Sequence, residues 1–366
     1  MSERIALHNL SYDQLTDLLT GWGEPSFRAG QVWQWLYGSL ADDFASMGNL
    51  PLELRERLAE ETRLTLLEPI AGQTSATGLT RKVLFRLHDG QTIESVLMLY
   101  DDRRTVCIST QAGCGMGCTF CATGQGGLAR NLSPGEIVAQ VLHFARELRA
   151  RKIEHAQAAG IRANLEEHPI SNIVLMGMGE PLANFAATWQ AIETLTDDRG
   201  YNLGARRITL STVGLVPGIQ RLAKEALPIN LAVSLHAASN ELRDQLLPIN
   251  QRYPLEPLMA AVHDYAEQSR RRITIEYALI EGVNDAPDQA WELAVLLAGL
   301  SCHVNLIPLN PTPGSALRPS PQERVDAFAN ALEQAGIPAT VRMRRGIDIE
   351  AGCGQLRQRR MDNAGK

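Results

Sequence analysis

Three cysteines, Cys114, Cys118 and Cys121, stand close together in the segment "CGMGCTFCATG". Disulfides use cysteines in pairs, a structural zinc site normally closes with four ligands, and an ordinary ferredoxin cluster also takes four thiolates. For zinc, the nearest downstream histidine is His143, in the middle of a predicted helix. Three thiolates suit a 4Fe–4S cluster with one iron left open for a small molecule, much as catalytic zinc keeps a free position. Zinc binding and plain electron transfer are the alternative interpretations.

Polar residues that could bind such a small molecule follow other predicted strands. Glu180, in "GMGEP" at residues 177–181, has the charge to pair with an ammonium group. Taken alone, this segment is better explained as a glycine turn before a helix-starting proline. Further candidates at or near strand ends are Gly179, Ser211, Ser234, Leu235, His236 and Asn310. Each alone is more often a turn or cap residue, and only their shared location favours them as a set.

Further residues of interest lie outside this group. Cys353 stands between glycines in "RRGIDIEAGCGQL" near the end of the sequence. Free cysteine usually behaves as a small buried hydrophobe, but the flanking glycines and arginines disfavour burial and favour a reactive thiolate. For Cys107 and Cys302 the residues alone favour a buried structural position. For Glu94, on a predicted hairpin, they favour an exposed strand position.

The elements that must position these residues alternate between strand and helix from about residue 105. Predicted strands cover 105–110, 172–178, 207–212, 229–236, 273–280, 303–310 and 339–343, with amphipathic helical patterns between them. This alternation indicates an α/β fold with a parallel sheet, either open and doubly wound or closed into a partial (β/α)6 barrel. In both folds ligands bind at the carboxyl ends of the strands, where the cysteines and the polar candidates fall.

We expect four segments along the chain. Residues 1–75 carry helical patterns with start signals at Ser11 and Pro51, and form an accessory module. Residues 76–104 hold a β-hairpin whose turn is the Asp-Gly pair in "HDG". Residues 105–345 form the barrel, and residues 346–366 carry Cys353.

Composition narrows the class of protein. With 366 residues, of which 45% are hydrophobic and 21% charged, the chain can form one large α/β domain with a smaller module. No apolar run reaches membrane-spanning length, and the first residues lack the order of a signal peptide, so we expect a cytosolic protein. In a reducing compartment, six cysteines are more often metal-binding or catalytic residues than disulfides.

The charge pattern bears on the partner. A net charge of −6 argues mildly against nucleic acid. Arginines are nevertheless clustered at 103–104, 206–207, 270–272, 342–345 and 357–360. Any single cluster is most simply a solvated loop or helix end, but several together keep an RNA partner open.

The cysteine spacing C-x3-C-x-aromatic-C after the first barrel strand resembles that of the radical S-adenosylmethionine (SAM) superfamily. Nearly the whole chain further resembles the RlmN/Cfr family of radical SAM RNA methyltransferases. The similarity is carried by "GEPSFRAGQVWQWLY", "GQTIESVLM", "CISTQAGCGMGCTFCATG", "LMGMGEPL", "RRITLSTVG", "AVSLHA", "LPINQRYPL", "TIEYALIEGVND", "NLIPLNP" and "AGCGQL". Departures are Gly352, where alanine is usual, and the long insertion at 151–169, and neither touches a proposed site.

The resemblance implies a partial barrel in which Cys114, Cys118 and Cys121 hold a 4Fe–4S cluster that binds SAM at its open iron. It also implies SAM contacts by the seven residues Gly179, Glu180, Ser211, Ser234, Leu235, His236 and Asn310. In the implied mechanism, Cys353 becomes S-methylcysteine and transfers its carbon to RNA through a covalent crosslink. Cys107 then releases the RNA by a transient disulfide with Cys353, and Glu94 is the proton acceptor.

The implied substrate is C2 of an adenine in 23S rRNA and in some tRNAs, with two SAM molecules per turnover and an electron donor such as flavodoxin. The base must leave its stack to enter the barrel, while the N-terminal module and the arginines grip the RNA. No DNA or membrane partner is expected. C8 methylation, as in the Cfr relatives, stays open, although the large N-terminal region favours C2. A radical enzyme for a small molecule, or an iron–sulfur RNA-binding protein or electron carrier without catalysis, are the remaining alternatives.

Overall fold

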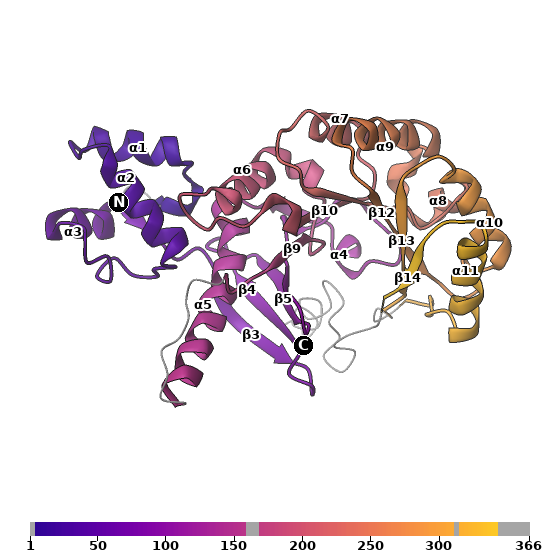
Figure 1. Ribbon diagram of the computed structural model, residues 1–366, viewed down its shortest axis with the longest axis horizontal. Coiled ribbons are helices and arrows are strands. Elements are labelled where there is room, and N and C mark those ends of the chain that lie inside the picture. The colour runs from indigo at the N-terminus through magenta and orange to yellow at the C-terminus, as the bar shows by residue number, and fades with distance from the viewer. Residues whose placement is uncertain (1–3, 159–167, 311–314, 343–366) are drawn as a thin grey trace.

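The computed structural model describes residues 4–158, 168–310 and 315–342, and one ten-stranded sheet organises this part of the chain. The strand order is β14-β13-β12-β11-β10-β9-β6-β5-β4-β3, so that neighbours in the barrel follow the order of the sequence. Two short two-stranded sheets accompany it, β1-β2 and β7-β8. Figure 1 shows the large sheet as a curved wall with helices around its outer side.

The barrel half of this sheet is parallel throughout. Its strands are β6 (Arg104–Cys107), β9 (Asn172–Leu175), β10 (Ile208–Thr212), β11 (Asn230–Ser234), β12 (Ile273–Leu279), β13 (Cys302–Pro308) and β14 (Ala339–Val341). The helices between them are α5 (Pro134–Ala158), α6 (Phe185–Thr196), α7 (Val216–Leu222), α8 (Asn240–Leu246), α9 (Leu255–Ser269), α10 (Pro287–Leu296) and α11 (Gln322–Gln334). The partial barrel, one of the two folds that the alternating pattern allows and the one that the family resemblance implies, is therefore confirmed. Its helices bury their apolar stripes against the sheet, in one continuous core.

The predicted hairpin is present as β4 (Thr80–Arg86) and β5 (Thr92–Leu99), with Gly90 at φ +81° in the turn. Strand β5 pairs antiparallel with β6, so the hairpin extends the barrel wall. A further strand, β3 (Glu68–Thr74), pairs with β4. The helical prediction for residues 1–75 is therefore wrong over 68–74. This segment carries no helical apolar period, and the open edge of β4 supplies its hydrogen-bond partners.

The N-terminal module is helical up to Glu61, as predicted. It contains α1 (Tyr12–Gly21), α2 (Phe27–Trp33), a π-helical turn (Gln34–Gly38) and α3 (Leu52–Glu61), beside the short pair β1 (Ile5–Ala6) and β2 (Thr62–Arg63). Ser11 caps α1 in a reciprocal capping box with Gln14. Trp33 and Tyr37 are buried with an edge-to-face contact at the centre of the module.

Two arginines of α5 fasten this module to the barrel. Arg146 donates to the carbonyl groups of Leu40 and Ala41, and Arg149 donates to those of Ser39 and Gly38. These bonds satisfy the carbonyl groups at the end of the π-helical turn and just after it, which would otherwise lack hydrogen-bond partners. None of the helices that the structure describes has the length and apolarity to cross a membrane.

The remaining short elements lie at the carboxyl ends of the barrel strands or in loops. They are β7 (Gln111–Gly113), α4 (Ala122–Gln125), β8 (Leu128–Asn131) and 3-10 turns at Leu7–Asn9, Pro181–Asn184, Ala205–Arg207 and Pro248–Gln251. The loop between β7 and α4 carries the three cysteines.

Candidate active site

The cysteine loop lies over the carboxyl ends of the barrel strands, as the sequence predicts. Its backbone is held at both ends, because Cys114 N–H donates to Gly127 O and Thr119 N–H donates to Leu246 O at the end of α8. Beneath it lies a second apolar cluster that is separate from the main core. This cluster joins the loop to strands and loops of the far side of the barrel and contains Cys118, Ala237, Leu246, Leu247, Ile280 and Leu309.

The three thiols of the cysteine loop lie close together, and those of Cys114 and Cys118 are largely buried. Burial raises the pKa of Cys114 to about 11. Burial, and to a smaller extent the negative charge of the neighbouring Cys121 and Cys114 sulfur atoms, raises the pKa of Cys118. The three sulfur atoms are therefore near neighbours, and the raised pKa values of Cys114 and Cys118 favour their protonated forms in the absence of a metal. Within the described ranges, no three His, Cys, Asp or Glu side chains converge as ligands of one ion. A 4Fe–4S cluster is wider, and its thiolates bind different irons.

The end of β9 approaches the start of β7 very closely. Gly179 has φ +101°, and a Cβ atom there would lie 2.5 Å from the Cβ of Gln111, so only glycine fits. Gln111 in turn accepts a hydrogen bond from Glu180 N–H. The backbone of "GMGEP" is thereby fixed next to the cysteine loop.

The Glu180 carboxylate links two strand ends. Its Oε1 atom accepts from Leu182 N–H at 3.0 Å, and its Oε2 atom accepts from Val213 N–H at 2.9 Å. The side chain is buried, and burial raises the pKa of its carboxyl group to about 7. A carboxylate accepts about four hydrogen bonds, and the hydroxyl of Thr212 supplies a third, which leaves room for a further donor.

The other proposed SAM contacts come from β10, β11 and the loops that follow β11 and β13. Ser211 and Ser234 bring their hydroxyl groups within 3.3 Å of each other. His236 adopts φ +59°, and its Nδ1 accepts from Ala278 N–H, which fixes the ring against Phe120 of the cysteine loop. Burial, and to a smaller extent the positive charge of Arg243, lowers the pKa of His236 to about 3, so the ring is neutral. Leu235 is buried next to them, and Asn310 is exposed after β13.

One buried arginine that the sequence analysis missed holds these ends together. Arg243 is 0% exposed and donates to Leu235 O, to Val213 O and to the side chain of Asn250. It therefore joins α8 to the ends of β10 and β11. The pattern "NELRDQLL" gives no sign of this, because the partners are backbone atoms distant in the sequence.

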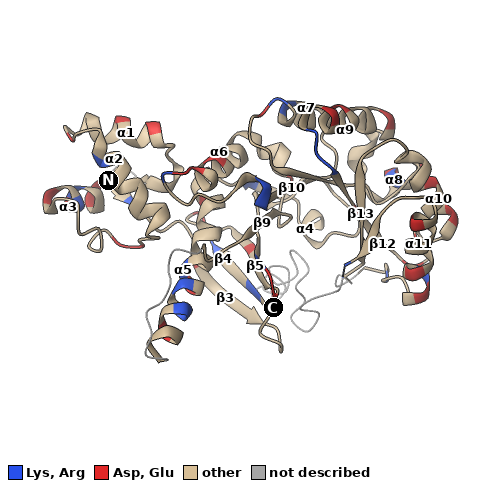
Figure 2. Ribbon diagram, viewed as in Figure 1, with Lys and Arg blue, Asp and Glu red and all other residues tan. Residues whose placement is uncertain are grey.

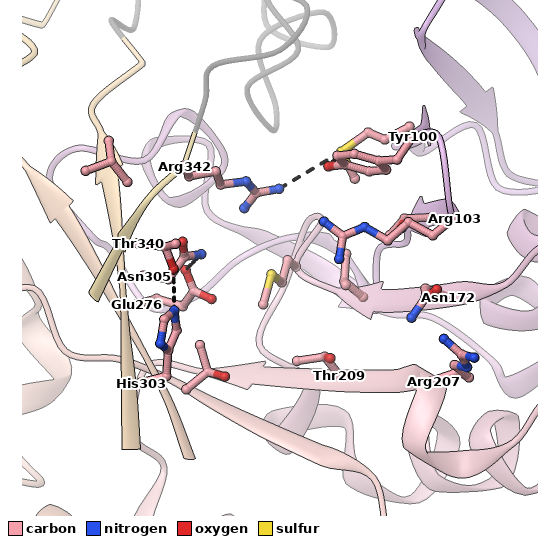
Figure 3. A pocket seen from close by; sticks show the side chains of 16 residues that line it. Tyr100, Arg103, Asn172, Arg207, Thr209, Glu276, His303, Asn305, Thr340 and Arg342 are labelled. Atoms are coloured by element: carbon pink, nitrogen blue, oxygen red, sulfur yellow. Dashed lines mark hydrogen bonds between the residues drawn. The ribbon is translucent and has the colours of Figure 1, made fainter. Parts of the chain in front are cut away.

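A cavity of about 550 Å³ occupies the other, amino-terminal part of the barrel lumen. Its lining includes residues from the beginnings of four strands, namely Thr105, Asn172, Thr209 and Thr274. Figure 3 shows Arg103 and Arg207 on one side and the polar side chains of β12, β13 and β14 on the other, with Arg342 reaching across toward Tyr100. A parallel barrel usually fills this space with apolar residues, so a cavity with polar lining residues here is a candidate ligand site.

Inside the cavity, the carboxylate of Glu276 accepts a 2.8 Å hydrogen bond from Asn305. Burial raises the pKa of Glu276, while Arg342 acts against this effect. Ser234, Glu276 and Asn305 are directly paired across β11, β12 and β13, so they project from one face of the sheet. The cavity therefore continues toward the proposed SAM contacts.

Glu94 is buried. Its side chain is 1% exposed, and its Oε2 atom lies 2.9 Å from Nζ of Lys82, which is 0% exposed. The exposed position that its residue type and hairpin location suggested is wrong, because the hairpin is part of the barrel wall. A lysine inside the apolar run "RKVLFRL" was the one sign of this partner in the sequence.

Cys107 ends β6 on the same wall. It is partly exposed, and burial raises the pKa of its thiol to about 11, against the opposing effect of Arg342. Cys107 is a free thiol, as are the four other cysteines that the structure describes. Cys302 lies in the core, as predicted. Cys353 lies outside the described residues, as do Arg344 and Arg345.

Comparisons with known proteins agree along nearly the whole chain. The family described as "Ribosomal RNA large subunit methyltransferase N-terminal domain" matches residues 5–64, and the "Radical SAM superfamily" matches residues 108–294. The "Probable dual-specificity RNA methyltransferase RlmN" of Chloroflexus aurantiacus is 54% identical over 97% of this chain and 93% of its own length. The "Dual-specificity RNA methyltransferase RlmN 1" of Myxococcus xanthus is 50% identical over 96% and 94%. A solved radical SAM methyltransferase from Sphaerobacter thermophilus is 50% identical, with a TM-score of 0.88 over 96% of this chain and 98% of that one.

Proposed function

The chain belongs to the RlmN family of radical SAM RNA methyltransferases, and on this premise we propose that it methylates C2 of adenine 2503 in 23S rRNA, and an adenine in tRNA as well. The enzyme uses a 4Fe–4S cluster and SAM. When bound, these groups supply the methyl carbon and the one-electron chemistry that an unreactive aromatic carbon requires. The residues of this chain bind these groups, hold the RNA base and move the protons.

The observation that carries the proposal is the polar cavity in the barrel lumen. Its volume of about 550 Å³ is in the range of pockets that enclose a small ligand, and a flipped-out base is such a ligand. Arg342 at its rim stands eleven residues before Cys353 in the sequence. A chain of this length spans at most about 40 Å, which is long enough for Cys353 to reach a base in the cavity.

The proposed roles are those that the family resemblance implies. Cys353 carries the methyl carbon, which would give up one hydrogen atom and one electron to the one-electron chemistry that the bound groups supply, and would bond to C2 of the adenine as a thioether crosslink. Glu94 accepts the proton that leaves C2. The Cys107 thiolate then attacks the sulfur of Cys353, the sulfur–carbon bond breaks with its electrons toward carbon, and that carbon takes up a proton to become the methyl group. Arg342 and Lys82 both favour the Cys107 thiolate that this attack requires.

The proposed SAM contacts are those predicted from the resemblance. Glu180 and the backbone near Gly179 would hold the amino group of SAM. Ser211, Ser234, Leu235, His236 and Asn310 would hold its carboxylate, ribose and adenine. Their place around the carboxyl ends of β9, β10, β11 and β13, next to the cysteine loop, supports this assignment.

For the RNA backbone we propose the arginine side of the cavity entrance. Arg103 lies with its guanidinium 4.3 Å from the centre of the Tyr100 ring, and Arg207 precedes β10 on the neighbouring side. Arginine side chains bind phosphate groups in two-pronged geometry. An rRNA substrate would place the enzyme in the cytosol, where flavodoxin or a similar protein could donate the electron.

Mass spectrometry of a methylated 23S rRNA fragment tests the assignment. Anaerobically reconstituted enzyme with SAM and a reductant should yield 2-methyladenosine, and 8-methyladenosine would establish the Cfr-type reaction instead. The Cys353→Ala variant should keep the iron–sulfur absorbance and lose RNA methylation. Full methylation by this variant would refute the role of Cys353.

A further inference from the structure

A buried ion pair on the hairpin lies beside the proposed site. Lys82 on β4 and Glu94 on β5 are joined by a 2.9 Å contact between Nζ and Oε2, and both side chains are at most 1% exposed. In the antiparallel register, Lys82 is opposite Val96 and Glu94 is opposite Leu84. The two charged residues are therefore diagonal neighbours on one face of the hairpin.

This face is the one that borders the cavity. Val96 is opposite Cys107 on β6, and Cys107 is opposite Val174 on β9. Directly paired residues project to the same side of a sheet, and Val174 lines the cavity. Lys82, Glu94 and Cys107 thus share one side of the barrel wall. Electrostatics agree, because both charges act on the Cys107 thiol, Lys82 favouring the thiolate and Glu94 opposing it.

We propose that Lys82 is a positioning residue that pairs with the Glu94 carboxylate and fixes it on the cavity side of the hairpin. The inference rests on the proposed function of Glu94 as proton acceptor. In that step the proton that leaves the target carbon passes to the Glu94 carboxylate, which becomes a neutral acid.

The physical reason is the burial of Glu94. Removal from water disfavours the charged form of a carboxyl group, and only the charged form can accept a proton. An ammonium group in direct contact restores the charged form and orients the carboxylate by a charge-assisted hydrogen bond. A general base whose carboxylate is buried in the barrel wall therefore needs such a cation.

Neither a contribution to fold stability nor contact with RNA explains the Lys82–Glu94 pair as well as a role of Lys82 through Glu94 does. The stability of the fold does not require an ion pair at this position, since well-packed apolar residues of similar volume are often as stabilising as a buried ion pair. A phosphate-binding role for Lys82 does not apply either, because its ammonium group already contacts the Glu94 carboxylate at 2.9 Å. A role for Lys82 through Glu94 is what remains.

Four variants of the full-length, cluster-loaded enzyme test the inference: Lys82→Met, Lys82→Arg, Glu94→Gln and the double variant Lys82→Met with Glu94→Gln. For each, kcat and KM are measured with an RNA fragment as substrate. Lys82→Met should lower kcat by about 100-fold, the range of a lost general base, with KM for RNA unchanged. Lys82→Arg keeps the cation and should recover most of kcat.

The double variant decides whether the lysine acts through the glutamate. Its kcat should equal that of Glu94→Gln alone, because Lys82 then has no carboxylate to act on. If the two losses multiply, or if KM for RNA rises, the inference is overturned. The double variant contains no unpaired buried charge. Should Lys82→Met fail to fold, the Lys82→Arg and double variants therefore give the answer.

The failure of this inference can be told apart from the failure of the proposed function. Glu94→Gln at the wild-type rate would contradict the proton-acceptor role itself. An inactive Glu94→Gln beside a fully active Lys82→Met would overturn only the role of Lys82. Arg81→Met is the matched control, since Arg81 neighbours Lys82 on β4, projects to the other face and pairs with Glu147 at 3.0 Å. It should keep kcat within about twofold of wild type.

Discussion

Single residues at the strand ends carry charge where little water reaches. Glu180 is 2% exposed, and burial raises the pKa of its carboxyl group to about 7, although the N–H groups of Val213 and Leu182 partly offset the effect. The folded protein therefore holds this proton more tightly than the unfolded chain, where the pKa is 4.5. Ionisation of Glu180 accordingly costs stability.

The first prediction concerns Glu180→Gln in the protein without SAM. The cost of ionisation is absent below the unfolded pKa and grows as pH rises toward the folded pKa, so wild type loses stability over this range and the glutamine variant does not. The variant should gain on the order of 3 kcal/mol relative to wild type between about pH 5 and pH 8. Urea unfolding at both pH values measures this, and an equal difference at the two values would contradict it.

Cys107 gives a second prediction at this scale. If it releases the RNA from Cys353, Cys107→Ala should accumulate a covalent protein–RNA adduct during turnover, visible on a denaturing gel. Cys302→Ala is the matched control, because Cys302 is a buried free thiol in the core and should form no adduct. A Cys107→Ala enzyme that turns over without adduct would remove Cys107 from the mechanism.

At the scale of elements, α5 connects the two parts of the molecule. It packs on the barrel with its apolar side, and its two arginines bind four carbonyl groups of the N-terminal module. Burial lowers the pKa of both guanidinium groups, which is consistent with a dry contact. The position of the module thus depends on a few strong bonds from one helix.

Replacing Arg146 and Arg149 together with methionine should therefore loosen the module. Hydrogen bonds from charged donors contribute about 1.5–3 kcal/mol each, so the loss should exceed about 3 kcal/mol. Thermal unfolding and limited proteolysis at residues 38–41 would measure it. Arg151→Met is the control, since its ion pair with Glu147 is half exposed and should be worth under about 1 kcal/mol. Equal effects of the two changes would contradict the assignment.

At the scale of the whole molecule, the net charge of −6 conceals an uneven distribution. Figure 2 shows acidic residues along the outer helices α10 and α11, whereas basic stretches lie before β10 and in the loop that leads to β12. Both basic stretches precede strands and so lie at the amino-terminal end of the barrel. There the cavity is lined by the first residues of the strands. An RNA that approaches there meets positive charge first.

The corresponding prediction is a change in salt dependence. Arg103→Ala with Arg207→Ala should weaken RNA binding and reduce the slope of log K against log salt by about 1.4, the value for two phosphate contacts on a single strand. Arg221→Ala with Arg324→Ala removes the same charge from α7 and α11 and should leave the slope nearly unchanged. Equal slopes for both double variants would refute the proposed entrance.

The sequence alone determined what depends on neighbours along the chain. Cys114, Cys118 and Cys121 occupy one eight-residue loop, so their spacing already indicates the cluster. Ser11 starts its helix and the Asp-Gly pair turns its hairpin through local bonds. The alternation of strand and helix likewise predicted a parallel α/β sheet, because parallel neighbours need a connecting helix.

Tertiary structure decided what depends on pairing across the sheet. Residues 68–74 became a strand because β4 offered an open edge, which no local pattern records. Glu94 became a buried ion-pair residue because Lys82 lies on the adjacent strand and the hairpin joined the barrel. The cavity came from side chains of seven separate strands or their flanking turns. Register and curvature bring such residues together, and both arise only when the whole sheet forms.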